Sequence, residues 1–215
     1  NHATGYREDD FNMDPLATHL DQFPNTTLLS IFSGDFIQWY FSEINKKFKN
    51  KNLPIYLTPF GMEETMLEKA EFASEHIKGI TAWSKKIKNS HNQHFIEVLE
   101  AKGKTPNLFS LISWESAALV EKIISLLDIY KTNLNEISSA LKDFEFKTPR
   151  GIISFDQKTN TTLSPLFEAK VVDKNGYCDI EIEKEITNYK EEFEKLASFQ
   201  LENINSAWYN SYTCI

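Results

Sequence analysis

The first 84 residues alternate short apolar runs with amphipathic stretches. The runs Leu28–Phe32, Leu53–Leu57 and Ile77–Trp83 have the length and composition of buried strands. In the stretches between them, apolar residues recur every three or four positions, which predicts helices. One helix begins at Asp14-Pro15. The apolar face of the next lies at Ile37, Tyr40, Phe41, Ile44 and Phe48. Because strand and helix alternate with short connections, we predict a Rossmann-like α/β fold, a parallel sheet with helices on both faces.

The second half of the chain has a different pattern. Helices are predicted over Asn92–Ala101 and Ser110–Tyr130, and the wide apolar face of the second predicts burial on most sides. Strands are predicted at Leu166–Val172 and Tyr177–Ile182, joined by a tight reversal at Asn-Gly. A final helix is predicted over Glu185–Ile204 from its apolar spacing. These elements extend the fold beyond the initial βαβ units.

Composition and charge narrow the class of protein. Of the 215 residues, 41% are hydrophobic and 13% aromatic, which is enough to bury a core. The net charge of −8 argues against binding to nucleic acid or to an anionic membrane surface. No apolar run approaches the roughly 18–20 residues that a membrane-spanning helix needs. Composition therefore indicates an acidic α/β protein but names no function.

The chain start and the cysteines leave two questions open. The chain begins with Asn1 and has no leader pattern, so we expect either a removed signal peptide or a trimmed fragment. Cys178 and Cys214 lie 36 positions apart, which fits neither a Cys-x-x-Cys redox motif nor a zinc site. They form either one disulfide, which needs an oxidising compartment, or two free thiols.

The loop Ser33-Gly34-Asp35-Phe36 is a candidate ligand-binding segment. Ligands of open parallel sheets bind outside the carboxyl ends of the strands, and this loop follows the first predicted strand. Gly34 lets a ligand approach the backbone, and the N–H groups of the following helix turn favour a carboxylate. Asp35 can instead hold an ammonium group. The alternative is that Ser33 or Asp35 only caps the helix.

A second loop, Thr58-Pro59-Phe60-Gly61, follows the second predicted strand in the same way. We therefore expect Thr58 and Phe60 at the same sheet edge. Trp83, at the end of the third predicted strand, either lines a binding cleft or belongs to the core. These residues complete the candidate ligand-binding set.

Other constellations are weaker. The His91-x-x-His94 pair has helical spacing but no third metal ligand, so surface histidines are favoured and no metal site is predicted. Arg150 either pairs with a carboxylate across a hinge or stabilises its own turn. Seven Glu and three Lys between Glu181 and Glu202 make either an acidic docking face or a solvated helix side. No Gly-x-Gly-x-x-Gly, phosphate-binding loop or His-Glu-x-x-His is present, so no cofactor and no catalytic group is predicted.

The segment Phe146–Asp156, whose first part to Gly151 we expect to be a turn, carries the most specific pattern. It resembles the Phe-x-(Ser/Thr)-Pro-Arg-Gly-x-(Val/Ile)-x-Phe-Asp turn of type I periplasmic binding proteins, the Leu/Ile/Val-binding-protein-like extracellular ligand-binding receptors. Gly79–Ser84 resembles the strand with which this family leaves its C-terminal lobe. Trp114–Leu127 resembles the helix of the segment that returns to the first lobe. In order, the matches extend over Asp10–Val172, so the chain resembles the C-terminal half of such a receptor.

The resemblance implies a domain division and a class of ligand. Residues 1–84 would form part of the C-terminal ligand-binding lobe, 85–173 a segment returning to the N-terminal lobe, and 174–215 a strand and helix that cross back. A small amino-acid-like or amphipathic solute would bind between the lobes, with Asp35 or Phe36 reaching the cleft. Phe60 stands where the amino-acid binders carry an acidic group for the ligand amine. The ligand implied is therefore more apolar or aromatic.

The resemblance also implies a mechanism, partners and a location. The family binds its solute by hinge closure without transforming it, and a membrane transporter of the ABC type or a sensor recognises the closed state. The location implied is periplasmic or extracellular, with or without a membrane anchor. Because an incomplete sheet exposes apolar edges, we expect a homodimer or a complementing N-terminal chain to cover them. The alternatives are a small α/β hydrolase or transferase using Asp35 and a histidine, or an interaction module with an acidic C-terminal helix.

Overall fold

The computed structural model describes residues 12–31, 36–48, 53–67, 76–131, 133–156, 159–174 and 177–202. The chain divides into two compact units. Unit 1 comprises Asn1–Lys86 and Phe167–Lys184, and unit 2 comprises Ile87–Leu166 and Glu185–Ile215. The chain thus passes from one unit to the other three times. The assignment of these segments to the lobes of a receptor stays a prediction.

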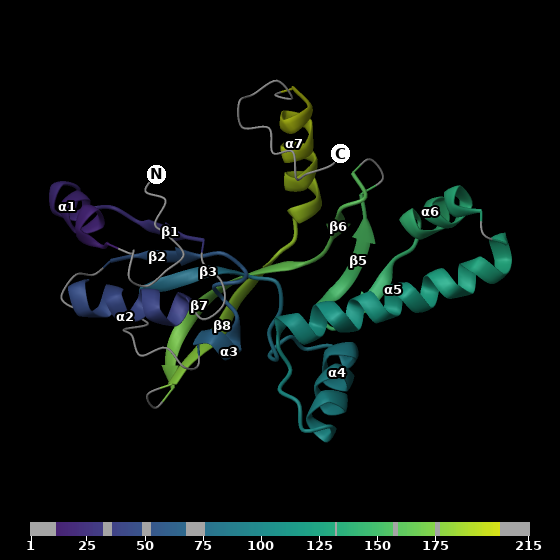
Figure 1. Cartoon of the computed structure of the whole chain (residues 1–215), viewed down its shortest axis with the longest axis horizontal. Helices are drawn as coiled ribbons and strands as arrows, with labels where there is room; N and C mark the ends of the chain where they lie inside the picture. The colour runs from purple at the N-terminus through teal and green to yellow at the C-terminus, as the bar shows by residue number, and fades with distance from the viewer. Residues whose placement is uncertain are drawn as a thin grey trace. The chain divides into compact units, whose positions relative to one another are not determined.

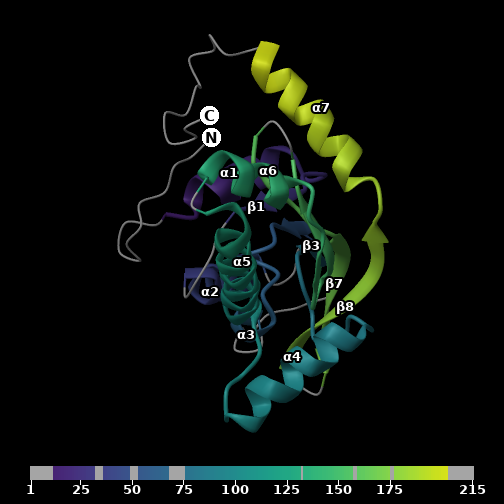
Figure 2. The ribbon, with the colours of Figure 1, turned by 90° about the vertical axis from the view of Figure 1, so that its right-hand side faces the viewer.

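Unit 1 is built on a five-stranded sheet in the order β1-β2-β3-β7-β8 (Figure 1). The strands are β1 (Leu28–Ser30), β2 (Ile55–Leu57), β3 (Ile77–Thr81), β7 (Leu166–Lys174) and β8 (Tyr177–Ile186). The pairs β1–β2 and β2–β3 are parallel, whereas β3–β7 is antiparallel. A two-residue connection can join only antiparallel neighbours, and β7 and β8 run side by side in Figures 1 and 2. The parallel β1–β2–β3 part confirms the predicted α/β class.

The register of the parallel strands decides where their ends lie. Ser30 of β1 pairs with Leu57 of β2, and Leu57 pairs with Gly79 of β3. The carboxyl ends of all three strands therefore meet at one edge of the sheet. A side chain at Gly79 would overlap the Leu57 carbonyl oxygen and lie 2.7 Å from Met62 Cγ, so only glycine lets β2 and the loop after it approach β3 this closely.

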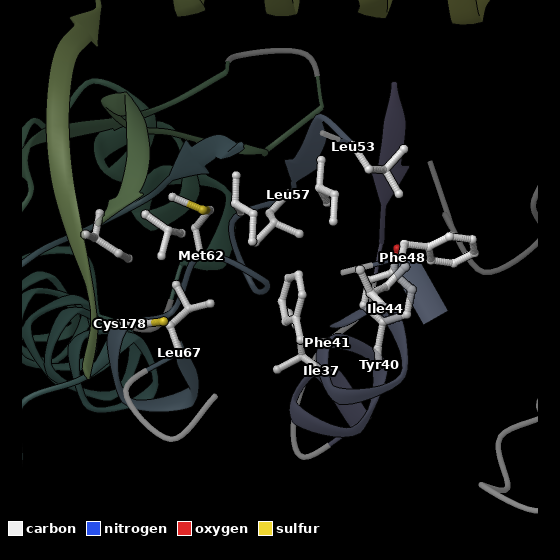
Figure 3. Packing of buried hydrophobic residues seen from close by; sticks show 14 of the residues in the cluster. Ile37, Tyr40, Phe41, Ile44, Phe48, Leu53, Leu57, Met62, Leu67 and Cys178 are labelled. Carbon is white, nitrogen blue, oxygen red and sulfur yellow. The ribbon is translucent and has the colours of Figure 1, made fainter. Parts of the chain in front are cut away.

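The core of unit 1 forms where helices pack on this sheet. These helices are α1 (Asp14–Gln22), α2 (Phe36–Phe48) and the short α3 (Glu64–Leu67). Five side chains of α2 are buried and point toward Leu53 and Leu57 (Figure 3). They are the five that the sequence pattern predicts: Ile37, Tyr40, Phe41, Ile44 and Phe48. The amphipathic spacing of α2 is therefore sufficient to fix its orientation on the sheet.

Unit 2 combines helices with a small antiparallel sheet. The helices are α4 (Ser90–Ala101), α5 (Leu108–Tyr130), α6 (Leu134–Lys142) and α7 (Tyr189–Glu202), and the strands are β4 (Phe146–Thr148), β5 (Gly151–Phe155) and β6 (Thr162–Leu163). Asparagine caps begin the first three helices. The Asn107 side chain, for example, accepts a bond from the Ser110 N–H, and the Ser110 side chain accepts one from the Asn107 N–H.

Two sequence predictions for local structure are wrong. Phe146–Thr148 is a strand rather than part of a turn, because it pairs with β5 and only residues 149 and 150 form the turn. The strand β8 continues to Ile186, where the final helix was predicted to have begun. Charged and apolar residues alternate from Cys178 to Glu183, and this period of two is typical of a strand with one buried face. The helix begins only at Tyr189.

The prediction that the long helix α5 is buried on most sides is also wrong. Its buried side chains are confined to one face, which carries Leu108, Leu111, Glu115 and Leu126. Large apolar side chains on other sides of α5 are exposed, namely Phe109, Val120 and Ile124. In Figure 1, α5 is the long teal helix.

Among the described residues, no helix combines the length and apolar character needed to cross a lipid bilayer.

Candidate functional site at the carboxyl edge of the sheet

Thr58 lies where β2 ends, beside the end of β1. Its N–H donates to the Ser30 carbonyl oxygen at 3.5 Å, which links the two strand ends. Its own carbonyl oxygen accepts bonds from the N–H groups of Gly61 at 2.9 Å and Met62 at 3.0 Å. These bonds hold residues 58–62 as a tight turn over the edge. The structure therefore brings Thr58 to the edge at which the sequence predicts it.

Two aromatic predicted site residues follow these strands. Phe36 is the first residue of α2 and is half-buried, with its ring centroid 5.1 Å from that of Trp39. Phe60 lies in the turn after β2, and 48% of its surface is exposed. Ser33, Gly34 and Asp35 lie outside the described residues, so their predicted contacts with a ligand stay predictions.

Trp83 follows β3 and is buried, with 3% of its surface exposed. Its backbone is fixed by Thr81, whose Oγ1 donates to the Trp83 carbonyl at 2.7 Å and accepts from the Trp83 N–H at 3.3 Å. The side chain thus has the environment of a core residue. Its predicted place in a cleft stays a prediction.

The site contains a polar network that the sequence analysis missed. Ser84, fully buried after β3, donates from Oγ to a carboxylate oxygen of Glu64 in α3. Lys86 Nζ pairs with Asp179 at 2.7 Å and donates to the Ile180 carbonyl of β8. The network therefore joins the segment after β3 to the helix α3 and to the strand β8. No local pattern signals it, because Ser84 and Glu64 lie 20 residues apart and Lys86 and Ile180 lie 94 apart.

The pKa values of the two acids in this network, Glu64 and Asp179, are shifted in opposite directions. Burial raises the pKa of the Glu64 carboxyl, and this outweighs the lowering by the Ser84 hydrogen bond and by Lys86. At Asp179 burial also raises the pKa, but hydrogen bonds from Lys174 and Lys86 outweigh it, so its pKa lies below the ordinary value. Of these two acids, Glu64 therefore holds its proton to the higher pH.

A second buried hydrogen bond fixes α2 against β1. The Ser30 hydroxyl and the Tyr40 hydroxyl lie 2.7 Å apart, and both residues are buried. Burial raises the pKa of Tyr40, against the lowering by this hydrogen bond, so the phenol stays protonated at neutral pH. The bond places the start of α2 relative to the end of β1, between which the predicted loop 33–36 lies.

Arg150 stabilises the turn in which it lies, which is one of the two roles that the sequence analysis left open. Its guanidinium forms a two-pronged ion pair with Glu115 of α5, with Nε–Oε1 at 2.9 Å and Nη2–Oε2 at 2.5 Å. Both residues belong to unit 2, so the alternative of a pair across a hinge is wrong. The Asn89 side chain also donates to the Pro149 carbonyl of the same turn at 2.9 Å. The turn is therefore anchored from two sides.

The remaining candidate groups are surface or core features. His91 and His94 are exposed, and the His94 ring packs edge-on against Trp114 at 6.0 Å. Within the described ranges, no three His, Cys, Asp or Glu side chains are grouped to hold a metal ion. Cys178 is buried in the core of unit 1, and Cys214 lies outside the described residues, so their pairing stays untested. On α7, Lys195 pairs with Glu192 at 2.7 Å on an exposed face.

A hollow of about 470 Å³ lies elsewhere on unit 1. It is lined by the end of α1 and the segment leading into β1: His19, Gln22, Phe23, Pro24, Asn25 and Thr26. This is the amino end of β1, whereas the site described above lies at the carboxyl ends of the strands. The hollow is wide open to solvent, and its lining shows no convergent set of buried polar groups, so it does not displace the carboxyl edge as the candidate site.

Comparison with solved structures decides the fold. No family model matches the sequence, and no curated protein matches it. An ABC transporter substrate-binding protein from Sphaerobacter thermophilus superposes with a TM-score of 0.72 at 14% identity, over 83% of this chain and 50% of that chain. The chain has the fold of type I periplasmic solute-binding proteins.

Two further structures with this fold show the same relation. A solute-binding protein of an ABC transporter from Rhodopseudomonas palustris, in complex with 3,4-dihydroxybenzoic acid, matches with a TM-score of 0.69 at 14% identity, over 81% of this chain and 48% of that chain. A leucine-, isoleucine-, valine-, threonine- and alanine-binding protein from Brucella ovis, in a closed conformation, matches with a TM-score of 0.68 at 13% identity, over 86% and 48%. The chain thus spans about half the length of the solved structures that it matches.

Proposed function

We propose that this chain is the C-terminal half of an extracytoplasmic solute-binding receptor. The observation that carries the proposal is the common carboxyl edge of β1, β2 and β3, with the turn at Thr58 closed over it. Open α/β proteins bind small ligands at the carboxyl ends of their parallel strands, which is the edge described here. The matched structures, which share the fold, are transport proteins that bind solutes, which supports binding without catalysis.

The proposed ligand is a small acid with an apolar body. Phe60 exposes about half of its surface at this edge, and Phe36 begins the neighbouring helix. Aromatic side chains of this kind pack well against a ring or a branched aliphatic group. Of the two nearby acids, Glu63 is buried and Glu64 is half-buried, and both accept bonds from protein groups. Two of the matched proteins bind a dihydroxybenzoic acid and branched-chain amino acids, which lie within this class.

The proposed mechanism is stabilisation of a closed state. A solute that binds the closed form better than the open form shifts the population toward it, and a membrane transporter or sensor then recognises that form. The location that follows is the periplasm or the extracellular space. The three passages of the chain between its two units are compatible with such a device.

A thermal-shift assay on the protein expressed from its natural gene tests the proposal. The panel comprises 3,4-dihydroxybenzoate, 4-hydroxybenzoate, leucine and phenylalanine. At 100 times its Kd, a ligand stabilises the native state by about 2.7 kcal/mol, which corresponds to a rise in Tm of about 5–10 °C.

Phe60→Ala provides the matched test of the edge. It should weaken the binding of the active solute at least about tenfold, since it removes an aromatic contact. Phe23→Ala is the control, because Phe23 is similarly exposed but lies by the amino end of β1. The proposal fails if no solute of the panel raises Tm, or if both variants lose affinity equally.

A further inference from the structure

The segment that follows β3 is held in unit 1 by a short series of polar contacts. Residues 82–86 come directly after β3, and Lys86 is the last residue of unit 1 before the chain passes to unit 2. We call these five residues the exit segment. Ser84, at its centre, is fully buried and donates from Oγ to Glu64 of α3. The same Oγ accepts the N–H of Lys86 at 3.1 Å. The polar contact between the exit segment and α3 therefore passes through one hydroxyl and one carboxyl group.

The positive charge next to Ser84 is already engaged by another element. Lys86 Nζ pairs with Asp179 at 2.7 Å and donates to a backbone carbonyl of β8. Lys174 pairs with the other carboxylate oxygen of Asp179 at 2.6 Å. In the described part of the chain, Ser84 is the one hydrogen-bond donor to the Glu64 carboxyl. An ionised Glu64 would therefore be half-buried with a single hydrogen bond and no ion-pair contact of its own.

The charged groups that act on Glu64 come from two neighbouring elements. Lys85 and Lys86 of the exit segment favour its charged form, and Asp179 of β8 opposes it. On its own helix, Glu63 accepts a backbone N–H of α3, and the face that the adjacent α2 buries carries apolar side chains and one tyrosine. Burial is the largest influence, so the pKa of Glu64 lies above its ordinary value of 4.5. The carboxyl is thus neutral in acid and becomes charged within the protein only above that value.

We propose that Glu64 and Ser84 form a proton-operated latch on the exit segment. With Glu64 protonated, residues 84–86 are docked on α3. When Glu64 loses its proton to solvent, release of these residues gives the carboxylate access to water. A group that holds its proton more tightly in the docked state weakens docking as the pH rises, so acid closes the latch and neutral pH loosens it. Only the use of the latch, as a response to acidity outside the cytoplasm, rests on the proposed function.

Hydrogen–deuterium exchange with residue-level mass spectrometry tests the latch in the protein expressed from its natural gene. The reporter is the Lys86 amide, which donates to Ser84 Oγ. The control is the Ser110 amide, which also donates to a side-chain oxygen, that of Asn107 at 2.8 Å in unit 2. After correction for the intrinsic pH dependence of exchange, protection of Lys86 should fall at least about threefold between pH 4 and 7, and protection of Ser110 should not. Equal responses of the two amides would overturn the proposal.

Two variants tie the response to Glu64. Glu64→Gln keeps an acceptor for Ser84 but cannot ionise, so the fall in protection at Lys86 should disappear. Lys85→Gln, at an exposed position, removes a charge that favours ionised Glu64, so the fall should move to higher pH. An unchanged fall in either variant would refute the latch. Since neither experiment uses a solute, its failure leaves the proposed function standing, and a silent solute panel leaves the latch standing.

Discussion

Removal of the Arg150 guanidinium should destabilise unit 2 strongly. The side chains of Arg150 and Glu115 are only 13% and 8% exposed, and they are joined by two hydrogen bonds. Arg150→Met keeps most of the volume but leaves the Glu115 carboxylate buried without its cation. Breaking a buried pair in this way costs about 3–5 kcal/mol. For a chain of this length, the loss corresponds to a fall in Tm of about 6–20 °C.

The design that separates the charge effect from packing is a double-mutant cycle. Glu115→Leu/Arg150→Met replaces both charges with apolar groups of similar size, and this replacement of a buried pair is often nearly neutral. We therefore expect the double variant to be more stable than Arg150→Met alone. Unfolding is followed by circular dichroism in a urea titration and by calorimetry.

An exposed ion pair provides the control for this cycle. The Lys195–Glu192 pair on α7 has a similar distance, but its side chains are 68% and 51% exposed. Lys195→Met should leave Tm unchanged, because solvent screens such pairs. The reasoning is refuted if Arg150→Met costs less than about 1 kcal/mol, or if the double variant is the least stable of the set.

Two further predictions concern the edge of the unit 1 sheet. Gly79→Ala should lower Tm much more than Gly61→Ala, because its methyl group meets the Leu57 carbonyl, whereas that of Gly61 meets a flexible side-chain end at 3.1 Å; equal losses in a thermal melt would contradict this. Glu64 holds its proton more tightly in the folded than in the unfolded state, so stability should fall as pH rises above its ordinary pKa of 4.5 toward the folded value. Glu64→Gln should lack this fall in a series of melts between pH 4 and 7, and a parallel decline in both proteins would refute the assignment.

The spacing of apolar residues predicts a helix or strand correctly when the pattern that sets its buried face lies within that element. The five buried residues of α2 and the start of α1 at Asp14 follow from spacing and from proline at the first turn. The parallel strands β1 to β3 follow from short apolar runs between helices. For each of these helices and strands, the information lies within its own short run of residues.

The strand Leu166–Val172 was predicted, but its partner in the sheet could not be predicted in this way. The antiparallel strand β7 pairs with β3 across about 90 residues of sequence, and its place in the sheet leaves no trace in its own alternation. The composition of α5 indicates burial on most sides, but Phe109, Val120 and Ile124 are exposed, and the apolar spacing of the helix does not show which of its sides are covered. The Glu64–Ser84 bond was missed for the same reason, since neither residue carries a local motif.

The residues of the Thr148–Gly151 turn, which carry the resemblance to the solute-binding family, are also the residues that the geometry of the turn constrains most. In the turn after β4, Thr148 Oγ1 donates to the Gly151 carbonyl at 2.9 Å, and Gly151 adopts a φ of +127°. A side chain at Gly151 would also lie 2.9 Å from Pro165 Cγ, so glycine is required twice over. Arg150 neutralises a buried acid. Each of these constraints on residue type arises from hydrogen bonding, backbone conformation or ion pairing within the fold.

This division explains why the fold could be inferred from the sequence while the ligand could not. Phe60 and Thr58 lie in a turn whose geometry is fixed by backbone hydrogen bonds from Gly61 and Met62, so the turn itself does not depend on which side chain stands at position 60. A pattern such as Thr-Pro-Arg-Gly therefore identifies the scaffold. Under the proposed function, the chemistry of a solute would be read from exposed positions on that scaffold, and Phe60, with 48% of its surface exposed, is one of them.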